Sequence, residues 1–373
     1  MLVLGSIACL ASAEASAEIQ AGDEKLKLFG DFWTRVEQDW DSQDAAGVER
    51  EDRGRLRVRA RLGLRYEPLP SWSFALRLRS GSETNHQGAY ITVVDFQGND
   101  TGNADFVVDQ WYAAGKRGGF SGWVGRNTQP FWRQNEMLLD DDATLAGAAA
   151  SWLREGRGGR FAAHAGYFSL PVGMRHFSGN LGGVQAVFDH GSPEQGFTIA
   201  LGCFVFEADP DDPDGLLLLD GDGSRDYRIL QAGAQGRLGV GGRPLTLGAE
   251  LLRNVEDYST TDPDPFTAAN AGRTEGYVLQ ARYGPAARAG SWLVGYSYAR
   301  IETFAVNSSY AQDDWVRWGT ADEGRASDLK GHELRGLFRP APGFEILARL
   351  YVAEAITSVE DGKRLRVDVG YQF

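Results

Sequence analysis

The feature that most constrains this chain is a long run in which basic and apolar residues alternate. Residues 53–66 read RGRLRVRARLGLRY, with arginine at positions 53, 55, 57, 59, 61 and 65 and mostly aliphatic residues between them. A period of two places successive side chains on opposite faces of a β-strand. The run therefore predicts a strand with one apolar face and one strongly basic face.

Similar segments recur along the chain, and no segment shows convincing helical periodicity. The strand-like segments lie at 25–36, 53–67, 71–82, 105–115, 119–127, 144–154, 159–169, 182–190, 195–206, 226–238, 243–254, 274–284, 290–301, 328–339, 343–354 and 362–373. Glycine is abundant, at 48 residues, as turn-rich β proteins require. We expect an all-β protein of about 16 strands.

The connections between these segments alternate between short and long. Short turns rich in Gly and Pro, such as PLP at 68–70 and PAPG at 340–343, are followed by long polar connections such as 83–104 and 302–327. In a transmembrane barrel the turns at one rim are short and the loops at the other rim are long. The alternation predicts an antiparallel up-and-down β-barrel with short periplasmic turns and long extracellular loops.

The two faces of the strands indicate which side meets lipid. In KRLRVDVGYQF at 363–373, the row from Leu365 to Phe373 is apolar, and the alternate row carries Arg364, Arg366 and Asp368. Apolar rows in several strands begin or end with aromatic residues, as the aromatic girdles of outer-membrane barrels do. We expect the apolar rows to face lipid and the charged rows to face a lumen that is too wide to fill with side chains.

Charge and the N-terminus narrow the function further. The formal net charge of −13 argues against a nucleic-acid partner, because nothing offsets repulsion by phosphates. Residues 1–17 contain a short apolar stretch followed by small residues, which is typical of a secretory signal peptide, although an ordinary N-terminal strand is the alternative. We therefore predict a signal peptide over 1–17 and a barrel over 18–373.

Residues 109–152, from DQWYAAG to GAAASW, resemble the putative porin family of proteobacterial outer membranes. The matching positions are Asp109, Gly125, Arg126, Asp140, Asp141, Asp142 and Gly147. The final Phe373 is similar to the C-terminal residue of Gram-negative outer-membrane proteins, which serves as a signal for the barrel-assembly machinery. The resemblance implies a channel in the bacterial outer membrane and names no solute.

In such a barrel the basic residues line the pore. The predicted pore-lining residues are Arg55, Arg57, Arg59, Arg61, Arg65, Arg77, Arg79 and Arg126. The resemblance implies that the loop 128–143 folds inward and narrows the channel. Its predicted constriction residues are Glu136, Asp140, Asp141 and Asp142, although an acidic run can also be a solvated strand start. Opposed charges across a constriction favour polar solutes over apolar ones.

Other motifs in the sequence give weaker evidence about function. The acidic segment 207–226 could hold Ca²⁺ through Asp220, Asp222 and Asp226, but a solvated loop bridged to lipopolysaccharide by divalent ions fits better. HELRG at 332–336 lacks the second histidine of a zinc protease, and the five histidines form no metal-binding spacing. We expect no catalytic residue, no metal and no cofactor.

The combined prediction is an outer-membrane porin for passive diffusion of small polar solutes and ions, with anions favoured. Two alternatives stay open: an outer-membrane hydrolase with its site at the outer rim, and a structural or adhesion barrel with a plugged lumen. The expected partners are the solutes, outer-membrane lipid and lipopolysaccharide. The sequence leaves open whether the barrel is a monomer or a homotrimer.

Overall fold

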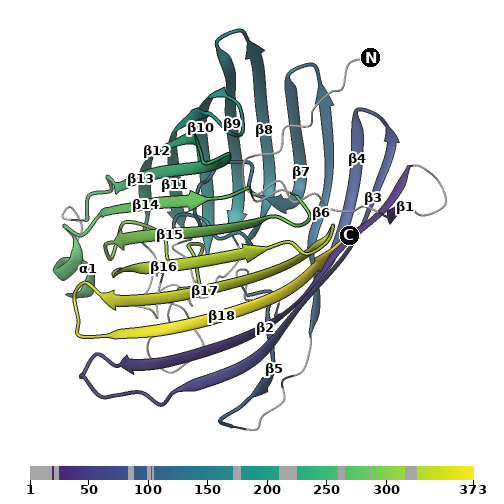
Figure 1. The fold of residues 1–373 in the computed structure, drawn as a ribbon. Coiled ribbons are helices and arrows are strands. Elements are labelled where there is room, and N and C mark those ends of the chain that lie inside the picture. The colour runs from purple at the N-terminus through teal and green to yellow at the C-terminus, as the bar shows by residue number, and fades with distance from the viewer. Residues whose placement is uncertain are drawn as a thin grey trace.

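A computed structural model places most of the chain in one closed antiparallel barrel (Figure 1). The described residues are 19–20, 25–82, 88–98, 102, 105–170, 178–209, 225–258, 265–285, 288–315 and 326–373. The predicted signal peptide, residues 1–17, lies outside the described residues, and so do Asp220 and Asp222. No helix in the described ranges is long and apolar enough to span a membrane.

Sixteen strands form the ring, which confirms the predicted number. They are β2 (Leu26–Gln43), β3 (Arg53–Leu69), β4 (Trp72–Ser80), β6 (Phe106–Arg117), β7 (Phe120–Thr128), β8 (Thr144–Gly156), β9 (Gly159–Leu170), β10 (Gly179–Gly191), β11 (Gly196–Ala208), β12 (Tyr227–Val240), β13 (Arg243–Asn254), β14 (Glu275–Tyr283), β15 (Trp292–Ile301), β16 (Leu329–Phe338), β17 (Phe344–Ala355) and β18 (Asp361–Gln372).

Three further elements were not predicted. The two-residue strand β1 (Ile19–Gln20) pairs with β2, and β5 (Ile91–Asp95) pairs with the part of β3 that lies beyond the end of β4. The short helix α1 (Pro265–Asn270) lies beside the ends of β13 and β14 (Figure 1). These elements extend or decorate the ring and leave its order unchanged.

The barrel closes between its last and first long strands. β18 pairs with β2 from Asp361 opposite Gln43 to Gln372 opposite Asp31. At the end of this seam, the backbone N–H of Gly30 donates to the Phe373 carbonyl at 2.9 Å, and the Phe373 N–H donates back at 3.0 Å. Closure provides hydrogen-bond partners for the backbone N–H and C=O groups of the edge strands, which an open sheet would expose to lipid.

The two rims differ as predicted. The turns of one rim, between β3 and β4, β6 and β7 and so on, contain two to eight residues, whereas connections at the other rim reach 27 residues between β15 and β16. The main difference from the prediction is β2, which continues to Gln43 and not only to residue 36. Its polar end, Glu37 to Gln43, remains a strand because its inward carboxylates bind arginines of β18.

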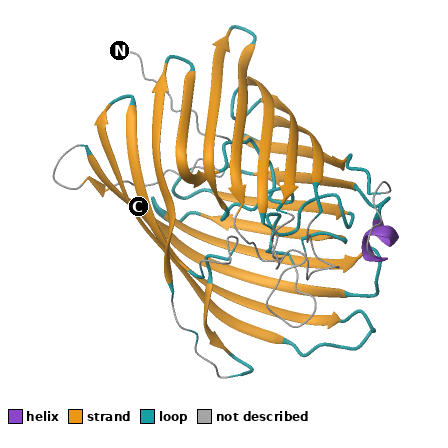
Figure 2. Cartoon of the chain, turned by 180° about the vertical axis from the view of Figure 1, so that it is seen from behind, coloured by secondary structure: helices purple, strands orange, loops and turns teal. Residues whose placement is uncertain are grey.

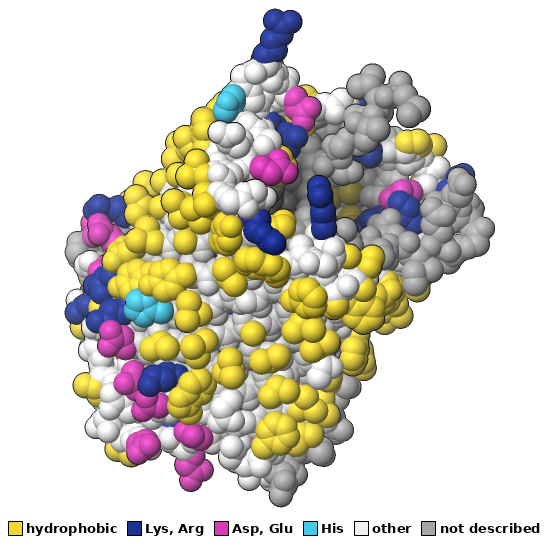
Figure 3. Space-filling view, viewed as in Figure 1, with side chains coloured by type: hydrophobic (Ala, Val, Ile, Leu, Met, Phe, Trp, Pro, Cys, Tyr) yellow, Lys and Arg dark blue, Asp and Glu magenta, His cyan; other side chains and the backbone are white. Residues whose placement is uncertain are grey.

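The apolar rows lie outside the ring. Leu62, Leu64, Leu76 and Leu78 are exposed at the outer surface, where Figure 3 shows hydrophobic side chains spread across the strands. The inside of the ring contains a second apolar cluster, in which Phe131 of the connection between β7 and β8 packs edge-on against Phe204 of β11 at 4.9 Å. Lipid therefore meets the outer apolar face, while inward loops pack against part of the inner face.

Candidate functional site: the lumen of the barrel

The arginines of β3 face a strand of mixed charge. Pairing with β2 sets Arg55 opposite Glu37 and Arg57 opposite Arg35, and residues at paired positions share one face of the sheet. Arg55 donates to Glu37 with both side chains buried, and Arg59 Nε donates to Asp31 Oδ1 at 2.9 Å. The predicted arginine row, Arg55, Arg57, Arg59 and Arg61, is therefore interleaved with carboxylates.

The same network continues across the closing seam onto β18. Arg366 Nε lies 2.6 Å from Glu37 Oε2, and Arg364 Nε lies 2.5 Å from Asp39 Oδ1. Arg35 Nε donates to Asp368 Oδ1 at 2.5 Å. We did not predict these residues as pore-lining, although the alternation in KRLRVDVGYQF had already placed Arg364, Arg366 and Asp368 on the charged face of the last strand.

The remaining predicted arginines divide into two groups. Arg77 Nη2 lies 2.6 Å from Asp109 Oδ2, and Arg79 Nε lies 3.9 Å from the same carboxylate, so both join the network through β6. Arg65 lies over the ring of Phe29 at 4.9 Å. Arg126 Nε donates to Thr144 Oγ1 at 2.9 Å, at the start of β8.

Tyr90 adds an aromatic ring to this side of the lumen. The guanidinium carbon of Arg35 lies 3.6 Å from the Tyr90 ring centre, and that of Arg59 lies 5.2 Å away. Arg57 Nη2 donates to the Tyr90 carbonyl oxygen at 2.9 Å. Stacking on an aromatic face fixes the plane of a guanidinium. Sequence reasoning placed Tyr90 in a long outer loop and missed this role.

The connection 128–143 lies inside the ring, where Figure 2 shows loops drawn in teal. Gln185 of β10 holds its backbone at both sides of Trp132, accepting from the N–H at 2.6 Å and donating to the carbonyl at 2.8 Å. Asn135 donates to Glu250 of β13, and Arg282 of β14 donates to the Gln134 carbonyl at 2.8 Å. The loop is thus fastened to the side of the barrel opposite the arginine row.

The four acidic residues of this loop differ in their ion-pair partners and in the direction of their pKa shifts. Asp142 accepts from Arg59 Nη1 at 3.0 Å and from Arg61. Burial opposes its ionisation, but Arg61 and Arg59 outweigh burial and hold the pKa of Asp142 well below its usual range. Carboxylate oxygens of Glu136, Asp140 and Asp141 lie within 4.8 Å of one another. Burial, with the nearby Asp141, raises the pKa of Glu136 to about 8.

A second connection, 302–315, also enters the lumen. Its Asp314 lies 2.5 Å from Arg349 Nη1, contacts Arg366, and lies 3.7 Å from Arg35. These arginines hold the pKa of Asp314 well below its usual range although burial opposes ionisation, whereas burial and the neighbouring Asp314 raise the pKa of Asp313 to about 6. The sequence carried one signal, since the acidic pair before Trp315 resembles the acidic run that ends the loop 128–143.

The two inward loops touch each other. The backbone N–H of Asp140 donates to the Tyr310 carbonyl at 2.8 Å. A polar cavity of about 110 Å³ lies between the loop 128–143 and the strands β14–β16, and its lining includes Glu136, Arg282, Glu333 and Arg335. Fixed charges of both signs therefore surround the lumen where the two loops meet.

Among the described residues, guanidiniums outnumber carboxylates in the network of ion pairs around the arginine row. The ten arginines are Arg35, Arg55, Arg57, Arg59, Arg61, Arg77, Arg79, Arg349, Arg364 and Arg366, and the seven carboxylates that they share are Asp31, Glu37, Asp39, Asp109, Asp142, Asp314 and Asp368. Such pairing offsets the cost of burying like charges side by side.

The other motifs of the sequence lie apart from this network. Asp226 accepts from the backbone N–H of Ala208 at 2.8 Å. His332 lies on an exposed position of β16, where its Nδ1 is 2.7 Å from the Tyr296 hydroxyl. Within the described ranges, one group of acidic, histidine or cysteine side chains is close enough together to hold a metal ion. It consists of Glu136, Asp140 and Asp141.

Comparison with known proteins also indicates a porin barrel. The model of the putative porin family matches residues 37–181. No curated protein matches the sequence. Solved structures similar to this one include OprB of Pseudomonas putida at high pH, with a TM-score of 0.58, 14% identity and 94% of each chain covered.

Two further similar structures are porins from other bacteria. The anion-selective porin of Comamonas acidovorans has a TM-score of 0.51 and 14% identity, with 93% of this chain and 99% of that one covered. A BenF-like porin of Pseudomonas fluorescens has a TM-score of 0.52 and 11% identity, with 94% and 99% covered. The predicted resemblance is confirmed over residues 37–181, which match the putative porin family, and the chain has the barrel fold of solved outer-membrane porins over its length.

Proposed function

We propose that this porin of the bacterial outer membrane is a passive diffusion channel that favours anions and small polar solutes. One observation carries the proposal: within the part of the chain that the structure describes, ten arginines share seven carboxylates in the lumenal network. An excess of fixed positive charge beside a water-filled passage attracts anions and repels cations. A guanidinium is a strong base, so the arginines carry positive charge at neutral pH.

The inward loops also support a preference for anions. Raised pKa values make Glu136 and Asp313 weaker negative charges than exposed carboxylates. The loop 128–143, with Glu136, Asp140, Asp141 and Asp142, then serves as one side of the constriction and the arginine row as the other. A barrel of the same fold, the Comamonas acidovorans porin, is described as anion-selective.

The hydrolase alternative is disfavoured by the chemistry of the lumen. A nucleophile needs a general base within hydrogen-bond reach and a group that orients that base. The network around the arginine row joins guanidiniums to carboxylates, which holds charges in place. Ser151 lies 2.8 Å from His164 Nδ1, but among the described residues no carboxylate or other group bonds the second ring nitrogen of His164 and orients it as a base. We infer a channel without catalytic residues or cofactors.

The proposal also includes the partners of the barrel in the membrane: lipopolysaccharide, the barrel-assembly machinery and further copies of the chain. Outward-facing Lys330 and Lys363 at the long-loop rim, paired with Glu354 and Asp41, would lie at the level of lipopolysaccharide headgroups. Phe373 is the proposed signal for the barrel-assembly machinery. A homotrimer is the proposed assembly, and native mass spectrometry in detergent measures the number of barrels directly.

Planar bilayer recording tests the channel. Purified protein should give stepwise conductance and a reversal potential shifted towards that of chloride in a KCl gradient. Replacing Arg55, Arg57, Arg59 and Arg61 with glutamine removes both ion-pair partners of Asp31 and of Asp142, and Glu37 keeps Arg366, so selectivity should move towards cations. An unchanged reversal potential would refute the assignment of the row to the lumen.

A matched control removes arginine from the outside of the barrel. Arg228 and Arg253 are exposed, with side chains 57% and 65% accessible. Their replacement with glutamine should leave the reversal potential unchanged. Absence of any conductance from a folded barrel would support the plugged structural alternative instead.

A further inference from the structure

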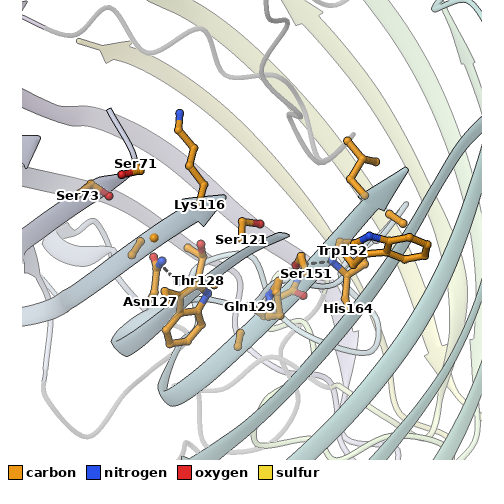
Figure 4. Close-up of a pocket in the computed structure, with 18 of the residues that line it drawn as sticks. Ser71, Ser73, Lys116, Ser121, Asn127, Thr128, Gln129, Ser151, Trp152 and His164 are labelled. Atoms are coloured by element: carbon orange, nitrogen blue, oxygen red, sulfur yellow. Dashed lines mark hydrogen bonds between the residues drawn. The ribbon is translucent and has the colours of Figure 1, made fainter. Parts of the chain in front are cut away.

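A second cavity, of about 440 Å³, lies between the loop 128–143 and the short-turn rim (Figure 4). Its size is within the range of small-molecule sites, about 300–1,000 Å³. The strands leave this space open because their lumenal positions carry small side chains, including Ser73 of β4, Ala114 of β6 and Ala149 of β8. We call this space the vestibule.

The polar groups of the vestibule are mostly uncharged. Ser151 of β8 and His164 of β9 face each other at 2.8 Å, and Asn127 at the end of β7 and Gln129 of the loop also line the space (Figure 4). Lys116 extends away from these side chains in the same view. Hydroxyl, amide and imidazole groups both donate and accept hydrogen bonds, so they suit a ligand that does the same.

Besides Lys116, the lining contains three charged side chains, and each of them has a partner of opposite charge. Glu67 lies 3.2 Å from Lys27, and Arg160 lies 3.0 Å from Glu155. Asp189 of β10 accepts from the Thr198 hydroxyl at 2.6 Å and from Arg237 Nη2 at 2.8 Å. The vestibule therefore differs from the arginine network, where charges dominate. A solute that has passed the constriction meets a lining in which uncharged polar side chains outnumber charged ones.

Tryptophans provide the apolar part of the lining. Trp132 is 4% exposed, its backbone is fixed by Gln185, and its indole N–H has no hydrogen-bond partner among the described residues. Trp123 stacks against Phe168, with ring centres 5.6 Å apart, and also lines the vestibule. Flat aromatic rings beside groups that donate and accept hydrogen bonds match molecules with both C–H faces and hydroxyl groups.

We propose that the vestibule is a binding subsite for neutral polyhydroxylated solutes, such as a hexose or a disaccharide, on the periplasmic side of the constriction. The proposal rests on the channel function proposed above and adds a solute class to it. Hydroxyls of the solute bond to Ser151, His164, Asn127 and Gln129, and its C–H face packs against an indole ring.

The test compares two adjacent alanines that point to opposite faces of β8. Ala149 lines the vestibule, whereas Ala148 is exposed on the outside of the barrel. Maltose added on the short-turn side of a planar bilayer should cause transient blocks of the KCl current. Ala149→Leu fills the vestibule and should weaken maltose binding about tenfold or more, whereas Ala148→Leu should not change it.

Two controls separate this subsite from the channel function. A polyethylene glycol of the same hydrodynamic size should cause no binding-type blocks, because it lacks hydroxyl donors along its length. Saturation-transfer-difference NMR with maltose on the detergent-folded barrel measures binding without any conductance. Ala149→Leu should weaken that signal, whereas Ala148→Leu should leave it unchanged.

The outcomes are distinct. A conducting channel whose maltose signal is absent, or equal in wild type and Ala149→Leu, overturns the subsite and leaves the porin proposal standing. A barrel that binds maltose by NMR in a manner sensitive to Ala149→Leu, yet conducts no ions, supports the subsite and overturns the channel.

Discussion

Removal of the Asp142 carboxylate, in Asp142→Asn, should raise anion selectivity and lower stability together. Asp142 neutralises two arginines, Arg59 at 3.0 Å and Arg61. Without Asp142, the ion-pair partner that both keep among the described residues is Asp31, at 2.9 and 3.8 Å. Loss of one charge-assisted partner at this nearly buried site should destabilise the barrel by about 1.5–3 kcal/mol.

The effect on selectivity follows from Coulomb's law. An ion that passes about 8 Å from the Asp142 position in water interacts with one charge by about 0.5 kcal/mol. The substitution helps an anion and hinders a cation, so the difference is about 1 kcal/mol, or about fivefold in the permeability ratio. Screening by salt reduces this to about two- to threefold.

The assay is the reversal potential of wild type and Asp142→Asn in a KCl gradient, with denaturant unfolding measured on the same preparations. Asp41→Asn is the control, because its carboxylate, 65% exposed, pairs with the outward-facing Lys363. The control should leave the selectivity unchanged. A shift towards cations in Asp142→Asn, or an equal shift in both variants, would show that Asp142 does not face the conduction path.

The remaining predictions concern pH, packing and assembly. Asp313, with its pKa raised to about 6, and Glu136, with its pKa raised to about 8, both gain negative charge as pH rises. Anion preference should therefore fall from pH 5 to pH 9. The double variant Asp313→Asn with Glu136→Gln should flatten that pH profile. A Cβ at Gly370 would lie 2.2 Å from the Trp33 ring, so Gly370→Val should reduce the yield of heat-resistant folded barrel on gels, and a normal yield would refute that packing. Phe373→Ala should lower the amount of barrel inserted in cells while refolding into detergent stays efficient; equal loss in both assays would assign Phe373 to stability alone.

Much of the fold could be predicted because its signals are local. Period-two alternation marks each strand, and the alternation of short and long connections identifies a barrel with two unlike rims. The predicted segments 53–67, 144–154 and 243–254 differ from β3, β8 and β13 by at most two residues at either end. The end of β2 was missed because acidic residues suggested a loop, and only pairing with β18 explains them.

The lumen was less predictable because it depends on contacts between distant segments. Sequence reasoning placed Arg55, Arg57, Arg59 and Arg61 on one face of a strand, yet their carboxylate partners come from β2 and from the inward loop. The role of Asp314 requires knowing that the connection 302–315 folds inward, and no pattern within one strand carries that information. The same limit applies to the vestibule, whose lining comes from several strands and one loop.

The most direct test of the central claim is the reversal potential of the purified wild-type barrel across a planar bilayer with a KCl gradient. Ten arginines that share seven carboxylates predict stepwise conductance with a reversal potential on the chloride side of zero, moving further in that direction as pH falls through about 6. A reversal potential on the potassium side at neutral pH would contradict the account.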